Sequence, residues 1–281
     1  MKKLIILFNI LILIVSCSGS KKEKAETRLE SARAALGRED FNTAKLEIDS
    51  LNKLYPEEFK LRKAGQDLLC IVVLKEQQHN LRYLSSMLES KEQELDAIKG
   101  EYTFEKDKKY QTIGNYFWRT QTVERNLRRS FLRFQVNELG IMTLTSIYHG
   151  GKYINHRLIK VIAPDGSYAQ TPASNNVYKD NYSNLKFEQA DFHYGADGGV
   201  INFLYANCNK NIRVEFLGGS KYTTTMLASD RQALKQIYLL TGVLTSIQKL
   251  KASIDDANVK IKFVLKKQKY DSLHLQQTNI K

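Results

Sequence analysis

The residue with the most specific chemical setting in this sequence is Cys17, a thiol at the end of a short apolar segment. Two lysines follow the first methionine, and mainly apolar residues extend from Leu4 to Val15. This segment is too short to cross a bilayer comfortably as a permanent helix, whereas a charged start and a short apolar centre are typical of an export signal. The small residue Ser16 fits a cleavage site. The sequence therefore predicts a signal peptide over residues 1–16.

The stretch Ile14-Val15-Ser16-Cys17 resembles the lipobox of bacterial lipoproteins. The resemblance implies that Cys17 becomes the first residue of the mature chain and carries fatty acyl groups such as palmitate. Residues 17–24 are then a lipidated tether. The segment Ser18–Lys24 is basic and lacks the acidic run that we associate with surface display in Bacteroidetes, the expected source. We therefore expect a lipid anchor in the cell envelope, at the outer membrane and facing the periplasm.

The other reactive side chains form no catalytic or metal-binding motif. None of the five histidines has the close spacing of a zinc helix, and His149 and His156, which could meet across a turn, are more simply explained as exposed residues next to a loop. Nucleophile elbows, phosphate loops and dinucleotide fingerprints are missing from the sequence. Asp191 and Asp197 would need a cleft to work as paired carboxylates. We expect no enzyme activity, no metal and no cofactor.

Tyr178 and Tyr182 are the candidate ligand-binding residues. Both lie in residues 171–184, a long polar segment that we expect to be a loop. Long loops in compact domains are often functional or disordered, and aromatic rings near polar loops can stack on sugars or anchor a protein partner. Tyrosine is also a common strand residue, which accounts for the tyrosines elsewhere in this half of the chain.

The charge of the chain narrows the classes of partner. A net charge of +13 favours anionic partners such as lipid head groups or acidic glycans, and export argues against nucleic acid. A basic cluster extends from Lys106 to Arg133, where a solvated helix face explains the charges equally well because acidic residues are interspersed. After Cys17 only Cys70 and Cys208 remain, which form neither a disulfide framework nor a zinc site, and Cys70 is expected to be a buried free thiol.

Residues 25–129 are predicted to be helical. Ala32, Phe41, Ala44 and Pro56 match the small, aromatic and helix-ending positions of one tetratricopeptide-type helical hairpin, which this stretch resembles. A seven-residue repeat of leucine then predicts a long coiled-coil-like helix, with Gln77 and Lys91 as polar positions in its seam. The repeat comprises Leu74, Leu81, Leu88, Leu95 and Tyr102. We expect the helix to continue towards Leu127.

Residues 130–228 are predicted to form an antiparallel β module of about seven strands. Alternating apolar residues and Gly- or Asn-containing turns indicate the strands, and Val200–Ala206 is among them. Residues 229–281 are expected to form a closing helix that packs antiparallel on the leucine seam, a strand over Val259–Leu265 and a loose tail after Tyr270. No family is recognised for the β module. The predicted class is α+β.

The expected function follows from the anchor and from the lack of catalytic motifs. We interpret the chain as a membrane-anchored envelope lipoprotein that acts as a non-enzymatic scaffold or protein-interaction module, with an envelope protein as its partner. The alternative is a lipoprotein that binds a glycan or a peptide with the loop at residues 171–184.

Overall fold

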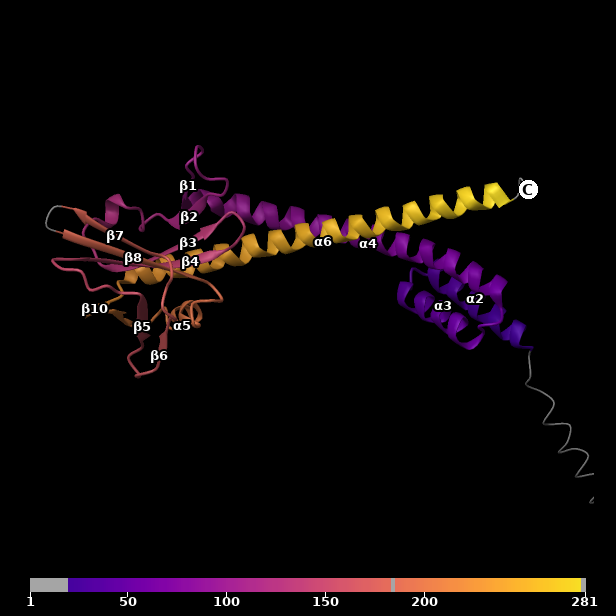
Figure 1. Cartoon of the computed structure of the whole chain (residues 1–281), viewed down its shortest axis with the longest axis horizontal. Helices are drawn as coiled ribbons and strands as arrows, with labels where there is room; N and C mark the ends of the chain where they lie inside the picture. The colour runs from indigo at the N-terminus through magenta and orange to yellow at the C-terminus, as the bar shows by residue number, and fades with distance from the viewer. Residues whose placement is uncertain (1–19, 183–184, 279–281) are drawn as a thin grey trace, which may run out of the picture. The chain divides into compact units, whose positions relative to one another are not determined.

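The structure is a computed structural model that describes residues 20–182 and 185–278 and confirms the α+β class. The chain divides into two compact units (Figure 1). The helical unit contains the described residues of 1–85 and 253–281, and the β unit contains those of 86–252. The predicted signal peptide and Cys17 lie outside the described residues.

The helical unit is built from α2 (Lys21–Gly37), α3 (Phe41–Leu54), the first part of α4 (Phe59–Ile98) and the last part of α6 (Ala228–Thr278). The side chain of Ser20 caps α2 by accepting a hydrogen bond from the amide of Glu23 at 3.1 Å. The prediction of a tether through residue 24 is therefore wrong from Lys21 onward, because the capped helix begins there.

The predicted helical hairpin is present. Ala32 on α2 and Ala44 on α3 are fully buried, as expected where two helices touch. Glu39 occupies the turn with φ 58°, the left-handed position where glycine is usual. The third helix also packs closely, since a Cβ atom placed on Gly65 of α4 would lie 3.0 Å from the Leu51 side chain.

Two residues of the C-terminal part of α6 show why the predicted strand over Val259–Leu265 is wrong. Ile261 and Val264 are turned inward at helical spacing, whereas Phe263 between them is 69% exposed. The apparent alternation thus combines buried and exposed positions of one helix. The helix continues to Thr278, so the predicted loose tail is also wrong over the described residues.

The described residues of the β unit form ten strands in two antiparallel sheets. The six-stranded sheet has the order β1-β2-β3-β4-β8-β7 and the four-stranded sheet has the order β10-β9-β5-β6. The strands of the first sheet are β1 (Tyr102–Glu105), β2 (Asn115–Trp118), β3 (Phe131–Asn137), β4 (Met142–Gly150), β7 (Val177–Tyr182) and β8 (Leu185–His193). Those of the second are β5 (Leu158–Ile162), β6 (Tyr168–Gln170), β9 (Arg213–Leu217) and β10 (Lys221–Thr225).

Three sequence predictions in this unit are corrected. The long helix ends at Ile98, and the 3-10 turn η1 (Lys99–Glu101) leads directly into β1, so strands begin before residue 130 and there are more than seven of them. Val200–Ala206 is the helix α5, not a strand. The segment 171–184 contains β7, which pairs with β8.

Two of these three corrections, at β1–β2 and at α5, have a local physical explanation. Gly114 lies against the Phe104 ring, where an added Cβ would be 2.3 Å from the ring, so this close approach of β1 to the start of β2 requires glycine. The carboxylate of Asp197 accepts a hydrogen bond from the amide of Ile201 at 2.6 Å, which satisfies one of the free amides at the start of α5.

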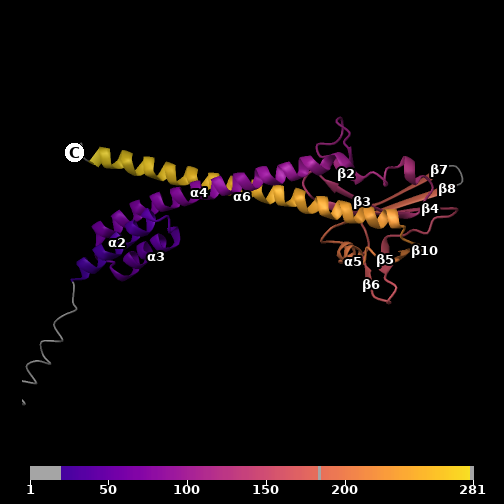
Figure 2. The ribbon, with the colours of Figure 1, turned by 180° about the vertical axis from the view of Figure 1, so that it is seen from behind.

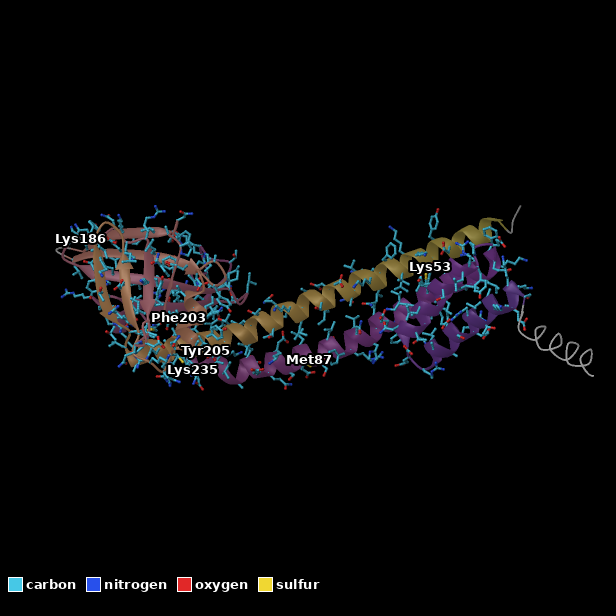
Figure 3. The ribbon with its side chains drawn as sticks, turned by 90° about the horizontal axis from the view of Figure 1, so that it is seen from below. Lys53, Met87, Lys186, Phe203, Tyr205 and Lys235 are labelled. Carbon is cyan, nitrogen blue, oxygen red and sulfur yellow. The ribbon has the colours of Figure 1, made fainter. Side chains whose placement is uncertain are left out.

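The core of the β unit joins the two sheets to α5 and to the first part of α6. Its largest fully buried side chains include Phe134, Ile159, Phe216 and Leu240. Tyr205 of α5, labelled in Figure 3, stacks on Tyr238 of α6 with ring centroids 3.9 Å apart. The end of α4 also packs here, and its Glu92 forms an ion pair with Lys251 of α6 at 3.0 Å.

Candidate functional site: a cleft on the six-stranded sheet

The two faces of the six-stranded sheet have different surroundings. Successive side chains of a strand point to opposite faces. Leu132, Phe134 and Leu144 point into the core of the β unit. Their neighbours Phe131 and Arg133 belong to the opposite face, which carries a cleft.

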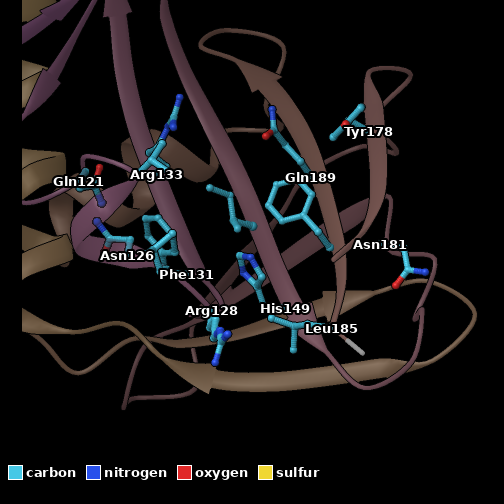
Figure 4. A pocket seen from close by; sticks show the side chains of 14 residues that line it. Gln121, Asn126, Arg128, Phe131, Arg133, His149, Tyr178, Asn181, Leu185 and Gln189 are labelled. Atoms are coloured by element: carbon cyan, nitrogen blue, oxygen red, sulfur yellow. The ribbon is translucent and has the colours of Figure 1, made fainter. Parts of the chain in front are cut away.

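This cleft has a volume of about 1160 Å³, slightly above the usual range of small-molecule sites, so it has room for a short extended segment. Strands β3, β4 and β8 form the floor of the cleft (Figure 4). Residues 121–128 form one wall, and β7 forms the opposite wall. The lining residues on which the site depends are Leu127, Arg128, Phe131, Arg133, His149, Tyr178, Phe187 and Gln189.

The wall at residues 121–128 is held in place by buried polar contacts. Gln121 is fully buried, and its side-chain amide donates to the Leu132 carbonyl at 2.9 Å and accepts from the Phe134 amide at 2.8 Å. Just beyond the wall, Arg129 forms two hydrogen bonds with the buried carboxylate of Asp230, at 2.7 and 2.9 Å. The short 3-10 helix η2 (Glu124–Asn126) is thus fixed to β3 and to α6, and the cleft is largely preformed.

Arg133 is the principal charged group of the cleft. Its guanidinium lies 4.4 Å from the centre of the Phe117 ring and donates to the Gln135 side chain at 3.2 Å. Its buried Nε has no hydrogen-bond partner among the described residues. Burial lowers the pKa of Arg133, because removal from water disfavours the charged form. The charges of Glu105 and Asp191 act against this effect of burial. A partly buried charge with spare donor capacity still favours an anionic ligand.

The rest of the lining adds a second positive charge and several rings. Arg128 contributes the charge from a left-handed backbone position with φ 60°. No described lining residue is acidic. The imidazole of His149 lies with Nδ1 3.0 Å from the Arg129 carbonyl, so Nδ1 carries the proton and donates, and the ring packs edge-on against Phe187 at 5.0 Å.

The structure brings one of the two predicted tyrosines into the cleft. Tyr178 is on β7, 53% exposed, and its hydroxyl donates to Asp180 at 2.9 Å. Tyr182 ends the same strand opposite Leu185, and its side chain lies outside the described residues. In the sequence, Arg128 and Arg133 belonged to the basic cluster, and His149 was noted as a histidine beside a loop. Their common position was not evident there, because it depends on the pairing of β3 with β4 and of β4 with β8.

A second polar cluster lies inside the β unit. The hydroxyl of Ser146 is 2.8 Å from Nε2 of His156, and Nδ1 of His156 is 2.8 Å from the carboxylate of Glu188. A nucleophile, a base and a carboxylate therefore stand in the order of a hydrolase triad, which the sequence did not reveal. All three side chains are fully buried, so substrate has no access and the arrangement is structural.

The carboxylate of Glu188 is the centre of that cluster. It accepts hydrogen bonds from the amides of Ile154, Asn155 and His156 at 2.7–2.9 Å. Burial alone raises the pKa of Glu188, but the hydrogen bonds from the amides and from the imidazole bring it below its usual value of 4.5. Burial lowers the pKa of His156 from 6.5, so the ring is neutral, Nδ1 donates to Glu188, and Ser146 donates to Nε2.

The other residues that the sequence singled out do not form sites. His149 lines the cleft on one side of β4, whereas His156, which follows β4 in the chain, contacts Ser146 on the core side, so the two do not meet. Asp191 accepts a hydrogen bond from Thr145 at 2.7 Å and one from Asn176 at 2.8 Å, whereas Asp197 caps α5. Cys70 and Cys208 are free thiols, and Cys70 is buried as expected.

Comparisons with known proteins give no relative for this chain: neither a protein-family model nor a curated protein nor a solved structure matches it. Within the described part of the chain, no group of histidine, cysteine and acidic side chains could hold a metal ion. Nor does any helix in that part combine the length and the apolar character needed to cross a membrane.

Proposed function

We propose that this chain is a lipid-anchored envelope protein that acts by binding, and that its cleft on the six-stranded sheet recognises a segment of a protein partner. The single observation that carries the proposal is the cleft itself: a preformed groove with two arginines, no acidic lining residue and a mainly apolar floor. The segment is expected to be acidic, with apolar side chains between its charges.

The exposed residues of the cleft favour a peptide over a purely polar ligand. On the wall, Leu127 is 69% exposed and Val123 is 54% exposed, and aliphatic side chains on a rim favour burial against a partner. At the opposite side, β7 is an edge strand of the sheet, where an extended peptide can add main-chain hydrogen bonds. Tyr178 beside this edge offers an exposed ring.

The first experiment measures binding of defined peptides to the chain that begins at Ser20. We expect peptides that combine Asp or Glu with Leu or Phe to bind, and basic peptides of the same length not to bind. Arg133→Met keeps the apolar stem and removes the charge, so affinity should fall about 10- to 100-fold, the cost of losing hydrogen bonds to a charged group. Arg213→Met, at an exposed position on β9 of the other sheet, is the matched control and should bind normally.

The second experiment identifies the partner in the cell. A photo-crosslinking amino acid at Leu127 should capture one envelope protein, and the captured site should be an acidic segment. The same group at Leu139, exposed at the β3–β4 turn away from the cleft, should not capture it. Capture that is unchanged by Arg133→Met would contradict the proposal. Binding of acidic glycans instead of peptides, lost with Tyr178→Ala, would favour the alternative of a glycan receptor.

The lipid anchor is tested independently of the cleft. Cells that express the full chain should incorporate radiolabelled palmitate, and Cys17→Ser should abolish both incorporation and membrane association. Mass spectrometry of the mature protein should show loss of residues 1–16 and acylation at Cys17. An intact leader or an unmodified thiol would exclude the anchor without affecting the peptide-binding test.

A further inference from the structure

We infer that the last part of α6 is a membrane-contact surface, residues Val259–Tyr270, that lies on an anionic lipid bilayer beside the acyl anchor. The inference extends the proposed anchor and concerns the helical unit, not the cleft. It starts from composition: these residues contain five lysines and no acidic residue. The lysines are Lys260, Lys262, Lys266, Lys267 and Lys269.

The helical spacing of this segment separates an inner from an outer side. Ile261 and Val264 face inward, where Val264 is 6% exposed. On the outer side, Val259 is 64% exposed, Phe263 is 69% exposed and Tyr270 is 62% exposed. Positions three, four and seven apart share one side of a helix, so these three side chains form a single row.

Two of the lysines lie on the same side of the helix as this apolar row. Lys262 and Lys266 are exposed and fall at the same helical spacing as Val259, Phe263 and Tyr270. A helix side that mixes exposed aromatic rings with lysines is the pattern of helices that lie in the interface of an anionic membrane. Charge complementarity therefore selects an anionic lipid surface as the occupant, since the exposed Lys262 and Lys266 beside the apolar row would attract anionic and not neutral head groups.

An adjacent groove supplements the apolar row. Leu69 and Val73 of α4 line it together with Val259 and Phe263, and its volume is about 360 Å³. The exposed apolar surface thus extends from α6 onto α4 within the same unit. Exposed apolar surface of this kind, bordered by charge, indicates an interaction site.

The anchor lies in the same unit and close to its end. α2 begins at Lys21, four positions after Cys17, and an extended chain of that length spans at most about 14 Å. Figures 1 and 2 both place the start of α2 and the end of α6 at the same end of the helical unit. Asp271 of α6 also raises the pKa of Lys63 near the start of α4, after the larger effect of Asp67. An acyl chain at Cys17 therefore holds this end of the unit at the bilayer.

The surface adds an electrostatic contribution to the membrane attachment that the acyl anchor provides. One acyl chain gives only marginal, reversible binding, whereas acylation combined with a basic surface gives stable association. Each lysine near an anionic bilayer increases the binding constant about fivefold, and the effect falls with ionic strength.

The test uses the chain from Ser20 to Lys281, which retains every described residue and lacks Cys17. Co-sedimentation should show binding to vesicles of phosphatidylcholine mixed with phosphatidylglycerol, weaker binding at high salt, and little binding to phosphatidylcholine alone. Lys262→Glu with Lys266→Glu should reduce binding by about tenfold or more. Phe263→Ser should reduce it at any salt concentration.

Two control variants keep the result specific. Lys75→Glu with Arg82→Glu makes the same charge change at exposed positions of α4, and Tyr83→Ser removes an aromatic ring that is 63% exposed. Both should bind vesicles as the unchanged chain does, and circular dichroism should show the same helix content in all variants. Equal binding to neutral and anionic vesicles, or equal loss in the control variants, would overturn the inference. Because the tested chain lacks Cys17, that result would not depend on whether the lipid anchor exists.

Discussion

Glu188 shows how one buried residue can link the stability of the β unit to pH. Its carboxylate is fully buried and bound by three amides and one imidazole. Such a group is expensive to bury without these partners, and the partners are effective only while it is ionised. The cluster therefore stabilises the connection between β4, β8 and the segment before β5 only while Glu188 is ionised.

The first prediction is that acid destabilises the β unit through this cluster. The pKa of Glu188 is below 4.5 in the folded chain, so its contribution is complete above pH 4.5 and is lost as the pH falls through the folded value. The pKa of His156 is below 6.5, so the unfolded chain takes up a proton first, and stability also decreases as the pH falls below 6.5. Urea unfolding at several pH values measures the combined slope.

Glu188→Gln supplies the comparison for that experiment. The amide cannot accept from all the donors that surround the carboxylate, so unfolding free energy at neutral pH should fall by about 2–4 kcal/mol. The acid-induced loss should be smaller in this variant than in the unchanged chain. A variant with the same pH slope as the unchanged chain would show that the titration arises elsewhere.

The second prediction concerns the triad-like geometry of Ser146. Ser146→Ala removes the partner of His156 Nε2 and should cost about 1–3 kcal/mol of stability. A fluorophosphonate probe, which labels accessible catalytic serines, should not react with the folded chain. Labelling at Ser146 would contradict the structural role and would indicate that the chain is a hydrolase.

At the scale of elements, the contact between residues 121–130 and α6 determines the shape of the cleft. Asp230 is 2% exposed and binds Arg129 through both oxygens. The third prediction is that Asp230→Ala costs about 3 kcal/mol, because it leaves a largely buried guanidinium without its counter-ion. Thermal unfolding measures the loss. Peptide binding to the cleft should weaken in the same variant, whereas Asp256→Ala on the exposed side of α6 should change neither property.

Two glycines in helices give the fourth prediction. Gly242 of α6 has open space around it, so Gly242→Ala should stabilise the chain by about 1 kcal/mol through helix propensity. Gly65 of α4 lies against Leu51, so Gly65→Leu should overpack the hairpin and destabilise it by about 1–3 kcal/mol. Calorimetry should show a higher unfolding temperature for Gly242→Ala and a lower one for Gly65→Leu. Stabilisation by Gly65→Leu would contradict the close packing.

Elements with a long regular pattern were predicted well, and short ones were not. The hairpin helices and the seven-residue repeat up to Ile98 follow directly from periodic burial. Tyr116 and Phe117 fit a helical face in the sequence, but tertiary pairing with β3 makes them part of a strand. For Ile261 and Phe263 the error was the reverse: the sequence predicted a strand, and the structure has the helix α6. A window of a few apolar residues fits both periods, and only the surrounding packing decides between them.

The cleft was less predictable than the fold. Tyr178 was found because it stood out in a polar segment, yet the reason was partly wrong, since it belongs to a strand and not to a loop. Arg133 stood out only as the last member of a basic cluster, and Phe131 gave no signal. Their shared position opposite the core depends on the register of β3 against β4. The buried contacts of Glu188 depend on partners more than thirty residues away.

On the scale of the whole molecule, the two units differ in how they are assembled along the chain. The β unit uses one continuous stretch, residues 86–252, whereas the helical unit needs residues from both ends. The fifth prediction follows: a chain that stops at Ala252 should keep the unfolding transition of the β unit and its peptide binding. It should lose helical stability and vesicle binding, measured by proteolysis and co-sedimentation.

This division also sets the order in which the parts of each unit are synthesised. Because synthesis starts at the N-terminus, residues 20–85 appear early, whereas the part of α6 that completes their unit, from Ser253 onward, appears last. The apolar inner side of the first three helices therefore stays uncovered until the entire β unit has been synthesised. We expect the chain to depend most on chaperones during this interval, and we expect a premature stop codon near the end to be more harmful than the few missing residues suggest.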